Sequence, residues 1–316
     1  MIDFQYLQTG LYGLANAHKA GTMAGHLGAA VVAGYFFGED QSDLPDEVFR
    51  GIEGELKRVI AGEESFWWNA KQAGVTPADL FQPFPKEKPH PDSIKTIAEA
   101  LQKNVGETRQ SGHNIIFASI ALRALHDHAD FATPQIITGI VKLTEGFNTA
   151  HAGRGYYGKE KGWLNGNQVT LAADDKFRPY ASIPEMVDVT IEELIATAAV
   201  KKQGFGGLWH LVNHAAAITE MDRFGFKELA KQALPAHHQH IRLWRSLPDV
   251  EGELGAVSKA EHDPRDPLYW KGMLKRDEAR LTHRIKTLYG FYTLKRFIEN
   301  EAQRKKADEA FLSLMA

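Results

Sequence analysis

Two histidines on one face of an apolar helix constrain this chain more than any other feature. Residues 206–221 read GGLWHLVNHAAAITEM, in which His210 and His214 are four residues apart. At 3.6 residues per turn, this spacing stacks the two side chains on one face, which Ala217 and Met221 continue. Because that face is otherwise small and apolar, the pattern predicts a buried helix that carries two titratable rings into the protein interior.

Two other stretches resemble this one. Residues 23–37 and 110–124 each place a glycine directly before a histidine, His26 or His113, and then continue as small apolar residues. Each stretch is followed by a short polar or acidic turn and then by a more amphipathic segment. The separations are longer than the repeat of a solenoid protein, so each repeat would hold a helical hairpin and further elements.

Composition limits the chemistry that this chain can perform. Its 316 residues contain no cysteine, which excludes disulfides, thiolate catalysis, zinc fingers and iron–sulfur clusters. Histidine and carboxylate groups are then the strong metal ligands that remain. Mixed charges with a net charge of −3 give no basic surface of the kind that nucleic acids require. We therefore expect a globular protein that does not bind nucleic acid and takes a small molecule as its substrate.

The sequence also predicts where the protein resides. No basic segment precedes an apolar stretch at the N-terminus, so we expect no cleaved signal peptide. The longest apolar window, 26–37, is much shorter than the roughly 18 to 20 residues that cross a bilayer. We expect a cytoplasmic protein without membrane contacts, which could form a homo-oligomer.

Helical periodicity runs through most of the chain. The proline-rich segment 81–91 predicts a surface loop, and the glycine-rich segment near 150–184 predicts an irregular insertion or small hairpin that turns at Asn165–Gly166. No composition shift marks a boundary, so we expect residues 1–316 to form a single all-helical domain. Helices are expected at 3–17, 23–37, 45–60, 92–110, 113–124, 134–147, 185–202, 206–221, 226–246 and in one or two helices from 267 to the end.

Helical hairpins with a small apolar first member and an amphipathic second member favour an α/α toroid, a barrel of parallel inner helices wrapped by outer ones. Parallel inner helices would bring His26, His113 and His210 to one rim. In its small-residue helices the chain resembles α/α toroids of the terpenoid-cyclase-like and six-hairpin kinds, which implies an architecture and not a function. The aspartate-rich signature of the cyclases is absent. An irregular helical bundle is the alternative.

Four histidines are the candidate metal ligands: His26, His113, His210 and His214. Neutral imidazole is a common ligand of zinc, iron and manganese, and two histidines four apart on a helix can bind one ion together. A metalloprotease motif is excluded, because Leu211 stands where that motif needs glutamate. The positive end of a helix dipole favours neutral imidazole near each N-terminus. We expect a divalent metal ion as the cofactor.

Four side chains are candidates for catalysis. His214 could act as an acid or a base, and Glu220 lies two turns further along the same helix. Arg154 and Tyr156 belong to a glycine-rich segment that could close over a ligand. The histidines of the segments 126–128 and 237–240 are expected to be solvated or peripheral.

Two classes of function follow from these residues. The first is a metal-dependent enzyme that acts on a small organic or sugar-like substrate by hydrolysis, elimination, isomerisation or oxygen chemistry. In a metal-free version of this enzyme, the same histidines serve as an acid/base pair of an isomerase or lyase. The second class is a non-catalytic helical scaffold whose histidines are structural.

Overall fold

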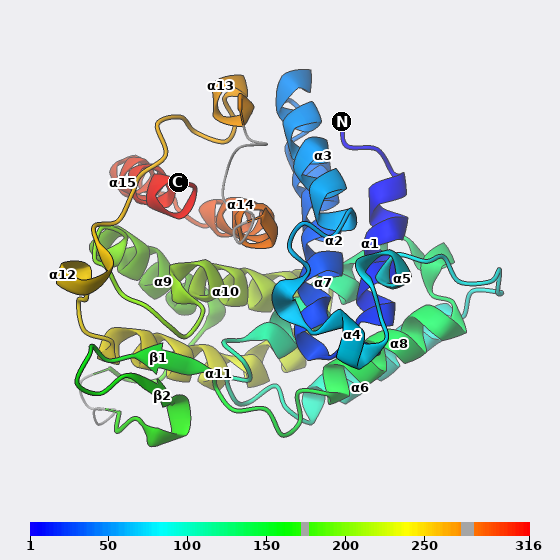
Figure 1. Cartoon of the computed structure of the whole chain (residues 1–316), viewed down its shortest axis with the longest axis horizontal. Helices are drawn as coiled ribbons and strands as arrows, with labels where there is room; N and C mark the ends of the chain where they lie inside the picture. The colour runs from blue at the N-terminus through cyan, green and yellow to red at the C-terminus, as the bar shows by residue number, and fades with distance from the viewer. Residues whose placement is uncertain (172–176, 273–280) are drawn as a thin grey trace. The chain divides into compact units, whose positions relative to one another are not determined.

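The computed structural model describes residues 1–171, 177–272 and 281–316, with the backbone alone at Phe66, and is mostly helical (Figure 1). The chain divides into two compact units. Unit 1 comprises Met1–Lys103, Phe117–Asn148 and His262–Tyr289. Unit 2 comprises Asn104–Ile116, Thr149–Glu261 and Gly290–Ala316. The single domain and the toroidal arrangement expected from the sequence stay predictions.

Unit 1 is built on the close packing of its first two helices, α1 (Gln5–Ala17) and α2 (Gly25–Asp40). A Cβ atom added at Gly28 would lie 2.3 Å from the backbone nitrogen of Leu14, so only glycine allows this approach. The other helices of unit 1 are α3 (Asp46–Ile60), α4 (Ala70–Ala73), α5 (Pro77–Leu80), α6 (Lys95–Gln102), α8 (Pro134–Glu145) and α13 (Pro267–Trp270), with 3₁₀ turns at Thr22–Ala24, Ser65–Trp67, Pro91–Ile94 and Ala129–Phe131.

Two helices contribute residues to both units: α7 (His113–Asp127) and α14 (Leu281–Lys295). Unit 2 otherwise centres on α10 (Gly207–Arg223), which packs against α9 (Ile183–Thr197) and α11 (Lys227–Ser246) (Figure 1). This helix includes three consecutive buried alanines, 215–217, whose small side chains allow close helix packing. Unit 2 also contains α12 (Glu251–Leu254), α15 (Glu301–Phe311) and 3₁₀ turns at Gly166–Gln168 and Leu312–Leu314.

The segment expected to be irregular contains a two-stranded hairpin in unit 2. Strands β1 (Arg154–Tyr156) and β2 (Trp163–Asn165) are antiparallel, with Tyr156 opposite Trp163. The chain therefore turns at 157–162, where Gly158 and Gly162 have positive φ, and the prediction of a turn at Asn165–Gly166 is wrong. Asn165 instead caps the 3₁₀ turn after β2, a role that its short amide side chain favours.

The predicted helices of the histidine stretches are confirmed as α2, α7 and α10, and His26, His113, His210 and His214 are all buried. The helix expected at 92–110 is wrong in its second half, because α6 ends at Gln102 and the backbone reaches positive φ at Gln110. Among the described residues, no helix is both long and apolar enough to cross a bilayer.

Candidate metal centre

Two left-handed backbone turns precede the histidine helices of unit 2. Before α7, Gln110, Ser111 and Gly112 have φ of +43°, +59° and +83°, and before α10, Phe205 and Gly206 have φ of +47° and +72°. Residues with a side chain rarely adopt this conformation, because Cβ then approaches the following carbonyl oxygen. Such strain persists only where surrounding contacts hold it, and it is concentrated at functional sites.

The segment around β1 holds both turns in place. The backbone N–H groups of Gln110 and Ser111 donate to the carbonyls of His151 and Ala152, at 2.7 and 2.9 Å. Phe205 N–H likewise donates to the Arg154 carbonyl at 2.8 Å. The irregular insertion therefore has a structural task, which is to fix the two turns that lead into the histidines.

Each turn orients one imidazole through a backbone carbonyl. His113 Nδ1 hydrogen-bonds the Gln110 carbonyl, and His210 Nδ1 donates to the Gly206 carbonyl at 2.6 Å. Because a carbonyl only accepts, the hydrogen of each ring is on Nδ1, and Nε2 carries a lone pair. Metal-binding histidines usually donate their other ring N–H to a carbonyl or carboxylate in this way.

The two Nε2 atoms face one another. They lie 3.0 Å apart, and the rings are buried, with centroids separated by 4.5 Å. Two nitrogens bound to one ion at about 2.0 to 2.1 Å have roughly this separation. Two lone pairs that point at one another repel unless a cation, either a metal ion or a shared proton, lies between them. His113 and His210 thus fit the first two ligands of a metal ion.

A second group of histidines in unit 2 is packed around His214. His214 Nδ1 lies 3.2 Å from His240 Nδ1, and the ring of His237 lies 5.2 Å from that of His214. His237 is held by Tyr180, whose hydroxyl is 3.2 Å from Nδ1, and by the Leu211 carbonyl, 3.2 Å from Nε2. All three rings are fully buried.

Burial sets the protonation of this group. Desolvation lowers the pKa of His214 well below its ordinary value, and the neighbouring histidines lower it further. For the same reason the pKa of His237 falls to about 3 and that of His240 to about 4. At neutral pH the rings are therefore uncharged, as a proton acceptor or metal ligand must be.

The expectation that the segment 237–240 is peripheral is wrong. His237 and His240 have no exposed surface, because α11 packs against α10 with this face. A signal was present in the sequence, since both histidines continue an apolar stripe at helical spacing that includes Ala230, Ala233 and Ile241. The stripe was missed because residues 237–240 are four consecutive polar side chains.

In unit 1, His26 is buried beside aromatic and titratable groups. Its ring stacks on Trp67, with centroids 4.0 Å apart and an interplanar angle of 8°, and the ring of His283 lies 5.0 Å away. His26 Nδ1 is hydrogen-bonded to Lys286 Nζ at 2.5 Å. Since His26 belongs to the other unit, its membership of a site with His113 and His210 stays a prediction.

Lys286 and Glu64 are buried groups of unit 1 that sequence reasoning missed. Burial lowers the pKa of Lys286 to about 7, against the opposing effect of Glu64, and burial raises the pKa of Glu64 to about 7. Glu64 accepts a hydrogen bond from Thr282 N–H at 2.5 Å. His283 and Lys286 were overlooked because the C-terminal region is rich in charged residues and reads as solvent-exposed.

The other predicted catalytic residues have partners of their own in unit 2. Glu220 is buried and pairs with Arg223 at 3.2 Å. Arg154 is exposed and stacks on Trp163, while Tyr156 donates to Glu253 at 2.7 Å, which raises the pKa of Tyr156. The catalytic roles of Glu220, Arg154 and Tyr156 stay predictions.

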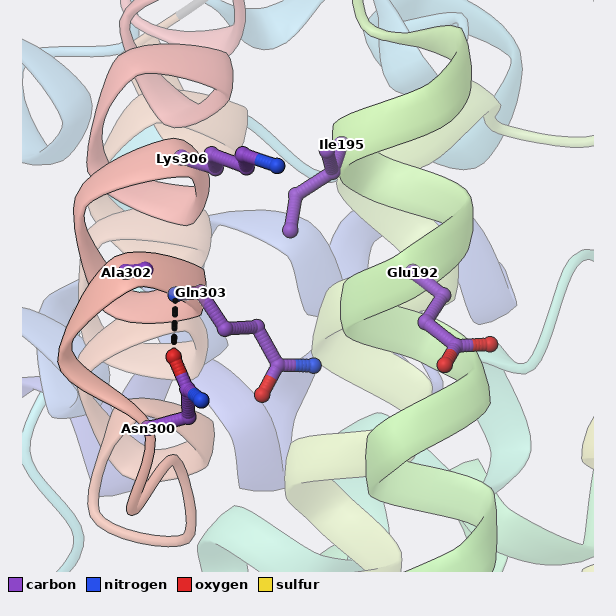
Figure 2. Close-up of a pocket in the computed structure, with 6 residues that line it drawn as sticks. All are labelled: Glu192, Ile195, Asn300, Ala302, Gln303 and Lys306. Atoms are coloured by element: carbon purple, nitrogen blue, oxygen red, sulfur yellow. Dashed lines mark hydrogen bonds between the residues drawn. The ribbon is translucent and has the colours of Figure 1, made fainter.

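Two surface cavities of unit 2 contain no histidine. One, of about 340 Å³, is lined by Tyr156, Trp163, Lys201, Gln203 and Leu254. The other, of about 480 Å³, lies between α9 and α15, where Figure 2 shows Gln303 and Lys306 directed toward α9. Asn300 accepts from Gln303 N–H at 3.0 Å, which caps α15 at the edge of this cavity (Figure 2). Neither cavity is lined by His113 or His210.

Comparison with protein-family models, with curated proteins and with solved structures returns no match for this chain.

Proposed function

We propose that the protein is an enzyme that binds a divalent metal ion through His113 and His210 and acts on a small organic substrate. One observation carries the proposal: two buried imidazoles point their Nε2 lone pairs at one another across 3.0 Å, while the Nδ1 atom of each is bonded to a carbonyl. A structural histidine pair would place a hydrogen between the rings, whereas metal ligands carry their hydrogens on the far side.

Further ligands complete such a site, because zinc, iron and manganese bind at least four atoms in proteins. His26 and His214 are the candidates that the sequence predicts. Both are buried. A set of neutral ligands leaves the ion its full positive charge, so a bound ion would polarise a substrate oxygen or lower the pKa of a water molecule. Hydrolysis, elimination, isomerisation and oxygen chemistry all use that property.

The protein's own contribution is to fix the two rings. The left-handed turns hold the Gln110 and Gly206 carbonyls in place, and these carbonyls set the orientation of His113 and His210. Rings that are oriented before the ion arrives lose little further entropy on binding it. This is a physical reason for keeping a strained backbone next to the site.

A metal-free acid/base enzyme is the second candidate. The Nε2 separation of 3.0 Å also suits a proton shared between the rings, which would make the pair a single acid/base group of an isomerase or lyase. The two candidates differ in one measurable property, since only the first needs metal.

Titration of the chelator-treated protein with Co²⁺ tests the proposal, because cobalt reports its coordination in the visible spectrum. We expect saturable absorption bands in the wild type and their loss in His113→Ala and His210→Ala. The matched control is His90→Ala/His126→Ala, which removes two exposed imidazoles and should titrate as the wild type does. Equal titration of all four proteins would contradict the proposal.

A further inference from the structure

The smaller surface cavity of unit 2 gathers apolar side chains that are exposed to solvent. Its volume is about 340 Å³, and two of the residues that line it, Trp163 and Leu254, are 45% and 44% exposed. Most large apolar side chains among the described residues are buried. Exposed apolar side chains that meet around a hollow mark a place where another molecule binds. Cavities that hold small molecules measure roughly 300 to 1,000 Å³, so this one suits a compound of about one or two rings.

The pairing of β1 with β2 puts the aromatic rings of this cavity on one face of the hairpin. Tyr156 lies directly opposite Trp163, and Arg154, two residues before Tyr156, shares that face because side chains alternate along a strand. The two rings have centroids 5.6 Å apart. The Arg154 guanidinium lies over the Trp163 ring, 4.9 Å from its centroid. The indole is thus supported on one face and still presents surface on which a planar ring can stack.

Hydrogen bonds join the walls of the cavity. Tyr156 N–H donates to the Gln203 carbonyl at 2.8 Å, which connects β1 to the segment before α10. Val250 N–H donates to the Lys201 carbonyl at 2.8 Å, which connects that segment to the start of α12. The Tyr156 hydroxyl donates to Glu253 of α12 at 2.7 Å. Walls that are fixed before a ligand arrives lose little conformational entropy when it binds.

Positive charge adjoins the aromatic surface. Lys201 lines the cavity, and Arg154 lies beside it on Trp163. Neither side chain forms an ion pair with a carboxylate of the residues that the structure describes. Glu253, an acidic residue next to the cavity, already accepts the hydrogen bond of the Tyr156 hydroxyl. The described part of the chain therefore supplies no counter-ion for Lys201, and an anionic group of a ligand would be one.

We propose that this cavity is a binding site for a small aromatic carboxylate. The ring of the ligand stacks on Trp163 and contacts Tyr156 and Leu254. Its carboxylate accepts hydrogen bonds from the Lys201 ammonium group and from the Gln203 amide. An aliphatic acid lacks the stacking interaction, and a neutral aromatic compound lacks the ion pair.

The composition of the cavity favours a small molecule over a protein partner. Of its five lining residues, three are apolar or aromatic and two, Lys201 and Gln203, carry hydrogen-bond donors, as is usual for small-molecule sites. The inference does not rest on the proposed function, because neither His113 nor His210 lines the cavity.

Titration of the full chain with 2-naphthoate tests the proposal, and 2-naphthamide is the neutral compound of the same shape. The protein is labelled with ¹⁵N-tryptophan, and the spectrum of Trp163→Phe identifies the indole N–H signal of Trp163 among the six tryptophans. We expect 2-naphthoate to shift this signal saturably and 2-naphthamide to bind at least about tenfold more weakly. Cyclohexanecarboxylate should likewise bind more weakly than benzoate. The absence of a saturable shift, or equal affinities for the acid and the amide, would overturn the proposal.

A substitution at Lys201 tests the ion pair. Lys201→Met keeps a long side chain without the charge, so it should weaken binding of 2-naphthoate at least about tenfold and leave binding of 2-naphthamide unchanged. Lys71→Met removes an exposed lysine of unit 1 and should bind both compounds as the wild type does. A Lys201→Met variant that still prefers the acid would contradict the proposal. If this variant does not fold, the comparison of the two compounds in the wild type decides.

Dilution of the protein without ligand distinguishes this site from an interface between copies of the chain. We expect the Trp163 signal to be independent of protein concentration. A signal that shifts with protein concentration alone would show that a second copy covers the cavity, against the proposal. All titrations use metal-free protein, so binding of 2-naphthoate supports this site whether or not His113 and His210 bind a metal ion.

Discussion

Gly206 lies against the ring that it orients: its carbonyl accepts from His210 Nδ1 at 2.6 Å, and a Cβ atom added to it would lie 2.0 Å from that nitrogen. The neighbouring Gly207 has nearly the same φ, +67° against +72°, but a Cβ atom there would meet nothing within 4 Å. The two glycines therefore share a backbone strain and differ in their contact with His210.

This pair gives a matched test of how the metal site is oriented. Gly207→Ala should cost about 1 kcal/mol of stability, because it puts a side chain at positive φ. Gly206→Ala should cost more, because its Cβ atom also collides with the ring of His210. Only Gly206→Ala should displace His210, and we expect metal affinity to fall at least about tenfold. Calorimetric titration measures both variants. Equal metal affinities in the two variants would show that this turn does not determine the orientation of the His210 ring.

The strain in the first turn predicts an unusual response to glycine. Gln110 has φ of +43°, which glycine adopts without steric cost. Gln110→Gly should therefore leave stability unchanged or raise it by up to about 1 kcal/mol. Gln232→Gly, an exposed substitution in the interior of α11, should instead lower it by about 1 kcal/mol. Urea unfolding compares the two, and an equal loss in both variants would argue against strain at Gln110.

Buried neutral histidines predict a loss of stability in acid. Burial lowers the pKa of His237 from 6.5 to about 3, so between these values the unfolded chain binds a proton that the folded chain does not. The contribution of neutral His237 to the free energy of unfolding is therefore fully present above pH 6.5. It falls by about 1.4 kcal/mol for each pH unit below that value. Urea unfolding measures this loss. Between pH 6.5 and 4.5, the free energy of unfolding of His237→Gln should fall by roughly 2 to 3 kcal/mol less than that of the wild type. Parallel curves for the two proteins would contradict the assignment.

Trp67 offers a reporter for the predicted role of His26. The two rings stack with centroids 4.0 Å apart, so a paramagnetic ion on His26 should quench the fluorescence of Trp67. We expect Co²⁺ to quench the wild type more than Trp67→Phe, and His26→Ala to lower metal affinity at least about tenfold. Normal metal affinity in His26→Ala would exclude His26 from the ligands while leaving His113 and His210 in place.

The sequence predicted more of the helices than of the chemistry. A glycine before a histidine and small residues after it correctly indicated that α2, α7 and α10 are helices whose histidines are buried. Periodicity carries that information because a helix face repeats every 3.6 residues. It does not reveal which ring nitrogen carries the hydrogen, which depends here on carbonyls that only the left-handed turns bring within reach.

Tertiary context also decided which polar residues are buried. His240 looked peripheral among four consecutive polar residues, yet it hydrogen-bonds the Phe205 carbonyl, 35 residues earlier in the chain. Lys286 lies in a part of the sequence rich in charged residues, yet its side chain is buried and bonds His26, 260 residues away. Contacts between residues so distant in the chain leave no trace in local periodicity.

The metal content of the purified protein tests the central claim most directly. The wild type and the control His90→Ala/His126→Ala are purified without chelator beside His113→Ala/His210→Ala, and bound metals are measured by mass spectrometry after dialysis. We predict about one divalent ion per chain in the first two proteins and essentially none in the third, with helix content unchanged. A wild type without metal after dialysis, or a His113→Ala/His210→Ala variant that retains it, would contradict the account.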